Sequence, residues 1–125
     1  MKNEIFRAYD VRGKYPQEIN EKAVFKIAAA LRGYFGAKAK IVVGYDARTS
    51  SPALYKEVVK GLGGKIIEAE MITTPMLYFL VNKLKADGGV MVTASHNPKN
   101  YNGLKVVGGG TRPINGLEIL KILNK

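Results

Sequence analysis

Apolar residues recur at helical spacing in four segments of the chain, with short apolar runs between them. In the first segment Val24, Ile27 and Leu31 fall on one side of a helix, which is typical of an amphipathic helix packed on a core. Each segment opens with a residue that can cap a helix, and in two segments a proline follows the cap. The pattern predicts helices over residues 20 to about 35, 51 to about 61, 74 to about 85, and from 115 onward.

The apolar runs between these segments predict short buried strands, because they are too short for helices and are bounded by glycine or polar residues. The expected strands cover residues 41–44, 65–69, 88–92 and 104–107, and Asn102-Gly103 is expected to form a tight turn into the last one. Helices that alternate with buried strands indicate an α/β fold, and the last two strands can pair antiparallel. We therefore expect one domain, residues 1–125, with a layered, mixed and mostly parallel β-sheet of about four strands flanked by helices.

The composition fits one domain with one core. A chain of 125 residues, 46% of them apolar, can bury a core and is not typical of a disordered segment. The chain has no cysteine, no apolar stretch long enough to span a bilayer and no apolar signal region at its N-terminus, so we expect a cytoplasmic protein without a membrane partner. Six large apolar residues are expected in the core: Met71, Met76, Met91, Phe25, Phe35 and Phe79.

The most informative segment is residues 93–105, with the sequence TASHNPKNYNGLK, which follows the apolar run 88–92. It places Ser95 at the exit of a buried strand, in a short polar loop that also holds His96 and Asn97. A hydroxyl in that position can be held rigid and still face a cleft, as a phosphoryl carrier or a nucleophile requires. Ser, Asn and Pro also favour ordinary turns, so the segment by itself leaves a simple turn open.

Two polar segments upstream, residues 6–13 (FRAYDVRG) and 44–51 (GYDARTSS), each place an aspartate two residues before an arginine. Residues two apart in an extended segment point to the same side. Asp10 is therefore expected to orient Arg12, and Asp46 to orient Arg48, with each guanidinium aimed at a phosphate or carboxylate. The alternative is two surface ion pairs that contribute little.

Together these three segments resemble the N-terminal domain of the α-D-phosphohexomutases, the family of phosphomannomutase and phosphoglucomutase. The resemblance runs from about Ile5 to the last helix, and residues 93–105 are its most specific part. Residues 6–13 and 101–103 are more similar to the mannose/glucose branch than to the glucosamine branch. The resemblance implies an isomerase of carbohydrate metabolism, an intramolecular phosphotransferase that interconverts hexose 6-phosphates and hexose 1-phosphates through a bisphosphorylated sugar.

The resemblance also assigns roles to individual residues. Ser95 would be a phosphoserine that gives its phosphoryl group to a phosphohexose and takes one back from the bisphosphate. Tyr9 is expected to line the cleft and hydrogen-bond near Ser95, Asn97 to cap its own loop, and Arg48 to bind substrate or only brace the loop. The expected catalytic residues are Ser95, His96, Lys105 and Arg12, the last three being candidates to carry the proton. The expected substrate-binding residues are Tyr9, Arg12, Asn97, Lys105 and Arg48.

The adjacent Ser95 and His96 also invite comparison with a hydrolase. Neighbouring side chains in an extended loop point apart, and no third orienting group or oxyanion motif is evident. We therefore set the hydrolase aside. The alternative that stays open is a non-catalytic α/β module that binds phosphorylated ligands or a protein partner.

The resemblance implies Mg²⁺ as the cofactor, and this sequence holds only part of its site. The family's metal ligands are aspartates of an Asp-Gly-Asp-type loop on a second domain, and no Asp-x-Asp spacing occurs here. The phosphate on Ser95 would supply one metal ligand, and octahedral Mg²⁺ needs several more oxygens. The metal-loop, sugar-recognition and phosphate-binding domains are absent from the sequence. We therefore expect the chain alone to be inactive or nearly so, with the remaining domains on a longer chain or encoded separately.

The chain has a formal net charge of +10. The lysines are spread along the sequence rather than gathered in a run, so we expect no nucleic-acid partner. A positive surface suits phosphorylated hexoses and acidic partner domains, and it also keeps a domain soluble. Mannose or glucose preference stays open, because the sugar-recognition loop lies outside the sequence.

Overall fold

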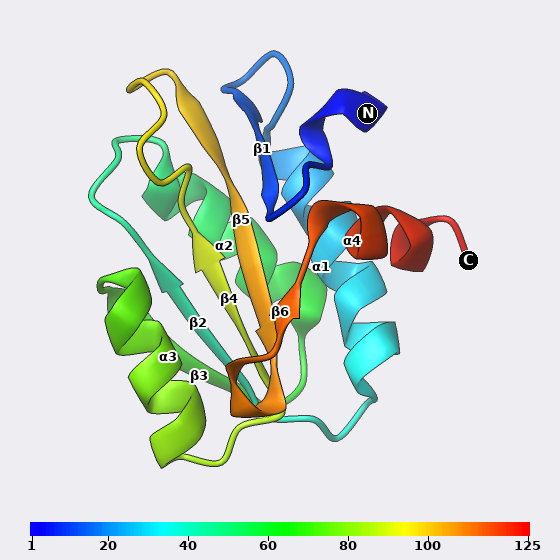
Figure 1. Ribbon diagram of the computed structural model, residues 1–125, viewed down its shortest axis with the longest axis vertical. Helices are drawn as coiled ribbons and strands as arrows, with labels where there is room; N and C mark the ends of the chain where they lie inside the picture. The colour runs from blue at the N-terminus through cyan, green and yellow to red at the C-terminus, as the bar shows by residue number, and fades with distance from the viewer.

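A mixed six-stranded sheet with the order β1-β5-β4-β2-β3 forms the centre of the protein, and β6 pairs with β5 along the same edge as β1 (Figure 1). The computed structural model describes residues 1–125. The strands are β1 Val11–Lys14, β2 Ile41–Tyr45, β3 Ile66–Met71, β4 Gly88–Val92, β5 Tyr101–Gly108 and β6 Pro113–Ile114. The helices are α1 Glu21–Phe35, α2 Ser51–Leu62, α3 Thr74–Lys83 and α4 Gly116–Leu123, with short 3₁₀ turns at Asn3–Ile5 and Gly109–Thr111.

The mixed α/β sheet expected from the sequence is confirmed, with two strands more than the four expected. β2 pairs in parallel with β3 and β4, whereas β5 pairs antiparallel with β4, β1 and β6. Only two of the five pairings are therefore parallel, fewer than the sequence pattern predicts. The additional strands β1 and β6 are short segments that run back along β5 and take their ladder hydrogen bonds from it.

Two local expectations are wrong in the same part of the sheet. Residues 6–13, expected as a polar loop, contain β1, and Asn102-Gly103, expected as a tight turn, lie inside β5 opposite β1. Gly103 is needed there because a Cβ atom at this position would overlap the carbonyl oxygen of Val11 and crowd the Cα of Arg12. The glycine therefore marks a close approach of two strands and not a turn.

Three of the four helix starts follow the expected capping chemistry, whereas the side chain of Ser50, before α2, makes no capping hydrogen bond. Asn20 caps α1 by accepting a hydrogen bond from the Ala23 N–H at 2.9 Å, and Asn115 forms a capping box with Glu118 at the start of α4. The caps of the two proline-containing helices lie one residue earlier than expected. Thr73 accepts from the Met76 N–H at 3.2 Å, and Ser50 occupies the corresponding position of α2.

Alternate residues of the sheet face two layers of helices. On one face α1, α2 and α4 cover the larger core, to which β2 contributes Ile41 and Val43. On the other face α3 covers a smaller core and packs against β2, β4 and the 3₁₀ turn Gly109–Thr111. The side chains of the smaller core are Val42, Leu77, Val81, Ala86, Met91 and Val107.

Four of the six residues expected in the core are exposed, and those expectations are wrong. Met91 is buried and Phe35 packs against the larger core, as expected. Met71 lies on the edge strand β3, and the other three lie on the outer sides of α1 and α3, whose opposite sides face the sheet. The four exposed residues are Met71, Met76, Phe79 and Phe25.

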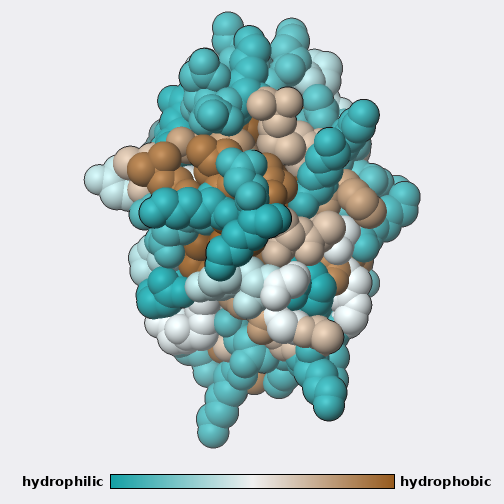
Figure 2. All heavy atoms as spheres, turned by 90° about the vertical axis from the view of Figure 1, so that its right-hand side faces the viewer, coloured by the Kyte–Doolittle hydropathy of each residue, from teal (hydrophilic) through white to brown (hydrophobic).

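Apolar surface also gathers on the side of the molecule that carries α4. Figure 2 looks onto this side and shows apolar residues surrounded by hydrophilic ones. Leu117 of α4 is 57% exposed, and three further apolar residues of this helix, Leu120, Ile122 and Leu123, are half-buried. None of the four helices combines the length and apolar character needed to cross a membrane.

Candidate functional site

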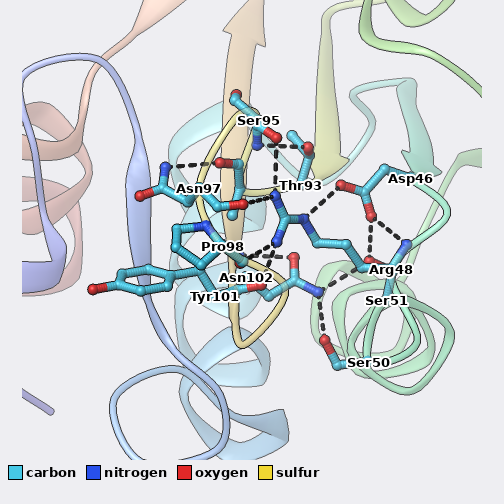
Figure 3. Close-up of polar contacts among 12 residues, drawn as sticks. Asp46, Arg48, Ser50, Ser51, Thr93, Ser95, Asn97, Pro98, Tyr101 and Asn102 are labelled. Carbon is cyan, nitrogen blue, oxygen red and sulfur yellow. Dashed lines mark hydrogen bonds and ion pairs between the residues drawn. The ribbon is translucent and has the colours of Figure 1, made fainter.

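The loop between β4 and β5, residues 93–100, presents Ser95 at the carboxyl end of a buried strand. The loop after β2 leaves the sheet at the same end (Figure 1). Thr93 begins the Ser95 loop and is buried, and its N–H donates to the Gly103 carbonyl at 2.9 Å. Ser95 itself is exposed, with its hydroxyl pointing out of the loop and its carbonyl turned inward (Figure 3). The hydroxyl is therefore available to a ligand, as the sequence predicts.

Ser95 adopts a backbone conformation that is unusual for a residue with a side chain. Its φ angle is 55°, in the left-handed region. Such conformations persist where the surrounding structure holds them, and they are common at functional sites. The Ser95 N–H donates to Thr93 Oγ1 at 3.0 Å, so one side of the residue is fixed by a buried side chain.

Asn97 caps its own loop, as expected. Its side-chain amide donates to the Ala94 carbonyl at 2.8 Å, and its backbone N–H donates to the same oxygen at 3.1 Å. Both contacts close the turn that follows Ser95. The Asn97 side chain therefore shapes the loop, whichever contacts it also makes to a substrate.

Arg48 reaches from the loop after β2 into the Ser95 loop. Its Nε donates to Asp46 Oδ2 at 3.3 Å, which confirms the expected pairing of this aspartate and arginine. The two terminal nitrogens, Nη1 and Nη2, each donate to two backbone carbonyls (Figure 3). Of the two roles expected for Arg48, the geometry supports bracing, since all five N–H groups already have partners within the chain. The four carbonyls belong to Pro98 at 2.6 Å, Asn97 at 2.8 Å, Ser95 at 2.9 Å and Tyr101 at 3.0 Å.

A buried polar network anchors this arginine to the start of α2 and to β5. Asp46 Oδ1 accepts from the Ser51 hydroxyl at 2.6 Å and from the Arg48 N–H at 3.1 Å. Asn102 donates through its side-chain amide to Ser50 Oγ at 2.8 Å and to Ser51 Oγ at 3.0 Å. Ser51 and Asn102 are fully buried.

The sequence predicts no part in the site for Ser50, Ser51, Thr93 or Asn102, although all four lie in the three polar segments. A polar residue that will be buried among other polar groups looks the same in sequence as one in a solvated loop. Only the structure, in which distant segments pair, shows that such a residue is buried.

Arg12 of β1 and Lys105 of β5 lie on one face of the sheet, on the two strands that pair beside the Ser95 loop. Arg12 is opposite Gly103, and Lys105 follows Gly103 by two residues, so both side chains point to the same face. Arg12 Nε donates to Asp10 Oδ1 at 2.8 Å, which confirms the second expected aspartate–arginine pair. Asp10 is 1% exposed, and its other oxygen, Oδ2, is buried without a partner.

Two expected site residues make no hydrogen bond within the chain. Tyr9 lies in the turn before β1 with 76% of its surface exposed, so its expected hydrogen bond near Ser95 is not formed. His96 is exposed directly after Ser95, and its ring has no hydrogen-bond partner in the protein. Both side chains are free to meet a ligand from outside the loop.

The surface around Ser95 is hollowed on the side of the β2 loop. Lys99, a cation for which the sequence predicts no role in the site, also lines this hollow. On the face of the sheet that α3 covers, which is also the face of Arg12 and Lys105, burial raises the pKa of the Tyr78 hydroxyl, and the nearby Asp10 carboxylate raises it further. The residues that line the hollow are Asp46, Ala47, Arg48, Thr49, Ser95, Asn97 and Lys99.

The side chains of this chain do not form a metal site by themselves. No group of three or more His, Cys, Asp or Glu residues is arranged to hold a metal ion. Asp46, the only carboxylate that lines the hollow beside Ser95, already uses both oxygens for Arg48 and Ser51. The donor set therefore does not fit Mg²⁺ without further oxygen ligands.

Comparison with known proteins identifies the family. The family model described as "Phosphoglucomutase/phosphomannomutase, alpha/beta/alpha domain I" matches residues 3–125. The chain belongs to the phosphoglucomutase/phosphomannomutase family and corresponds to its domain I.

Named relatives and solved structures agree with this assignment. The chain is 45% identical over 112 residues to "Phosphohexose mutases" of Xanthomonas campestris pv. campestris (strain B100), a match that covers 87% of this chain and 25% of that protein. It is 44% identical over 114 residues to "Phosphomannomutase" of Escherichia coli (strain K12), with 89% and 25% covered. A phosphoglucomutase/phosphomannomutase family protein of Burkholderia thailandensis superposes with a TM-score of 0.86 at 28% identity, covering 99% of this chain and 30% of that one. The chain thus spans about a quarter of the length of these curated relatives.

Proposed function

We propose that this chain is the phosphoserine domain of a phosphohexomutase, and that Ser95 carries the phosphoryl group between hexose 6-phosphate and hexose 1-phosphate. The names of the relatives, mutases of phosphohexoses and phosphomannose, support the reaction class. One structural observation supports the choice of residue. Ser95 is an exposed hydroxyl in a left-handed backbone conformation, in a loop whose carbonyls are bound by a single arginine.

The proposed chemistry needs one bond exchange at Ser95 in each half-reaction. The hydroxyl oxygen of the phosphohexose bonds to phosphorus while the bond from Ser95 Oγ to phosphorus breaks. The sugar hydroxyl loses its proton, and Ser95 Oγ gains one, so the products are a neutral serine and a bisphosphorylated sugar. After the bisphosphorylated sugar has reoriented in the site, Ser95 takes the other phosphoryl group of the sugar by the same exchange in reverse.

Arg12 and Lys105 are proposed to offset the charge of the phosphorylated loop. A phosphoserine carries about −1.5 to −2 charges near neutral pH, and it would repel a second phosphate without cations nearby. Phosphoryl transfer depends mainly on positioning and on neutralising such charge. The position of both cations on one face of the sheet, flanking Gly103, supports this role. Lys105, Arg12 and the exposed His96 remain the proposed proton carriers.

Mg²⁺ is proposed to bind with one oxygen of the Ser95 phosphate and with ligands from outside this chain. When bound, the cation would neutralise charge on the transferring phosphoryl group. The chain supplies too few oxygen ligands to hold the ion tightly. We therefore propose weak Mg²⁺ binding and little or no turnover by the chain alone, with the missing groups on the rest of a longer enzyme or on a separately encoded partner.

Intact-mass spectrometry tests the proposed function directly. The 125-residue chain is incubated with glucose 1,6-bisphosphate or mannose 1,6-bisphosphate, and one added phosphate is expected on the wild type and none on Ser95→Ala. Thr111→Ala serves as the matched control, because Thr111 is a half-buried hydroxyl in the 3₁₀ turn at the other end of β5 from the Ser95 loop, and its loss should leave the adduct unchanged. An adduct that survives in Ser95→Ala would rule out Ser95 as the carrier, and no adduct on the wild type would argue against phosphoryl transfer to this chain. Saturable binding of the bisphosphate without an adduct would instead favour a non-catalytic phosphate-binding module.

A further inference from the structure

We infer that Arg48 is the positioning residue of the Ser95 loop. Its guanidinium holds the loop in the one shape that presents the Ser95 hydroxyl, and it does so without touching the substrate. The inference rests on the proposed function in one respect, since it assigns the arginine to the presentation of a phosphoryl-carrying hydroxyl. The structural part, that Arg48 holds the loop, stands on the contacts alone.

The first support is the convergence of four backbone carbonyls on one cation. The oxygens of residues 95, 97, 98 and 101 all lie within 2.6 to 3.0 Å of Nη1 or Nη2 of Arg48. Their partial negative charges would repel one another without a positive group between them. Hydrogen bonds from a charged donor are stronger than neutral ones, and a planar five-donor fork fits such a set where a single ammonium does not.

The second support is that the guanidinium is itself held in place. Its side chain is only 13% exposed, and its Nε is bound by Asp46. Asp46 is fixed by the Ser51 hydroxyl, which in turn is bound by the buried Asn102. The arginine is therefore connected to α2 and β5, two rigid elements that meet beside the loop. A site supported in this way keeps its geometry with little reorganisation.

The third support is the conformation of Ser95. Arg48 Nη2 binds the Ser95 carbonyl and Thr93 Oγ1 binds the Ser95 N–H, so both sides of the residue are fixed at a φ of 55°. A residue with a side chain leaves this region when its supports are removed. Because every N–H of Arg48 is already in use, loss of the arginine should act through the loop and not through a missing substrate contact.

Hydrogen exchange at the loop amides tests the structural part. The reporters are the amides of Ser95, Asn97 and Tyr101, which are hydrogen-bonded inside the loop. Arg48→Ala and Arg48→Lys are expected to speed exchange at these amides by roughly tenfold or more, while the amides of α1 stay unchanged. Millimolar guanidinium chloride should restore protection in Arg48→Ala, and sodium chloride of equal ionic strength should not. Arg48→Met, which keeps the apolar stem, replaces Arg48→Ala if the alanine variant does not fold.

Arg32 provides a matched control at the opposite end of the sheet. Its guanidinium binds several backbone carbonyls, as that of Arg48 does, and they are those of Gly36, Ala39, Leu62, Gly63 and Lys65. Arg32→Ala should lower the midpoint of urea unfolding and leave exchange in the Ser95 loop unchanged. An arginine that merely stabilises the fold would behave like Arg32 in both measurements.

Phosphorylation of Ser95 by glucose 1,6-bisphosphate tests the functional part. In the wild type the rate of adduct formation sets the reference, and Arg48→Ala should be slower by roughly 100-fold, since a displacement of about 1 Å costs that much. Guanidinium should recover part of the rate. The inference is overturned if the loop amides of both Arg48 variants keep wild-type protection, or if both variants gain phosphate at the wild-type rate. A wild type that gains no phosphate defeats the proposed function, and the exchange data then still decide whether Arg48 holds the loop.

Discussion

At the scale of single residues, Asp10 is expected to matter more for the orientation of Arg12 than for the fold. The carboxylate is buried, with one oxygen on Arg12 Nε and the other without a partner. Asp10→Asn keeps the shape and one acceptor but removes the charge that pairs with the guanidinium. We expect the rate of Ser95 phosphorylation by glucose 1,6-bisphosphate to fall by roughly tenfold, and the free energy of unfolding to change by less than about 1 kcal/mol.

Intact-mass time courses and urea unfolding check this prediction. The exposed pair Lys60–Glu57 offers a control, because Glu57→Gln also removes one charge from an ion pair, on the surface of α2. That variant should change neither the rate nor the stability appreciably. A wild-type rate in Asp10→Asn would show that Arg12 does not depend on its aspartate.

The two aspartate–arginine pairs show what the sequence can and cannot predict at this scale. The spacing of two residues predicts the contacts Asp10–Arg12 and Asp46–Arg48, and both are present. The spacing does not predict which acceptors the remaining N–H groups of each arginine bind. The carbonyls bound by Arg48 lie about fifty residues further along the chain, and only the parallel pairing of β2 with β4 brings them within reach.

At the scale of secondary-structure elements, Gly103 is expected to control the pairing of β1 with β5. A Cβ atom at this position would overlap the Val11 carbonyl and crowd the Cα of Arg12, so Gly103→Ala must push the two strands apart. We expect a loss of about 1–3 kcal/mol in the free energy of unfolding, as for other overpacked sites, together with a displaced Arg12.

Urea unfolding followed by circular dichroism measures this loss. Gly33→Ala is the control, because Gly33 lies within α1 and nothing stands within 4 Å of the added carbon. That variant should stabilise the protein by roughly 0.5–1 kcal/mol, the usual gain for alanine over glycine in a helix. Equal effects of the two variants would mean that the strands separate at no cost.

Helices were more predictable than strands in this protein, for a physical reason. An amphipathic helix takes its hydrogen bonds from its own segment and shows its buried side in the local sequence, as α1 does from Val24 to Leu31. β1 and β6 take their ladder hydrogen bonds from β5, and their sequences carry no such local pattern. The same limit explains why Met76 and Phe79 were expected in the core, since the sequence does not say which side of α3 meets the sheet.

At the scale of the whole molecule, the stability of the fold is expected to fall with rising pH between about 10 and 12, in part because of Tyr55. Burial is the main cause that raises the pKa of this hydroxyl to about 12, from an ordinary value of 10.0. The unfolded chain therefore releases the Tyr55 proton at a lower pH than the folded chain does. Between these two values the folded state holds more protons, so the free energy of unfolding decreases as the pH rises, and below pH 10 the group adds no pH dependence.

Tyr55→Phe should make the decrease in the free energy of unfolding at high pH smaller, and it should not lower this free energy at neutral pH. The Tyr55 hydroxyl is buried and makes no hydrogen bond of good geometry, although the nearby Glu70 backbone opposes part of the rise in its pKa, so its removal breaks at most a weak contact. The pKa values of Tyr15 and Tyr78 are raised as well, which means that part of the decrease remains. Urea unfolding at pH 7 and at intervals from pH 9 to 12 measures the effect, with Tyr9→Phe as an exposed control that should keep the full wild-type decrease. A Tyr55→Phe variant that follows the wild-type curve throughout would show that the buried hydroxyl does not link folding to pH.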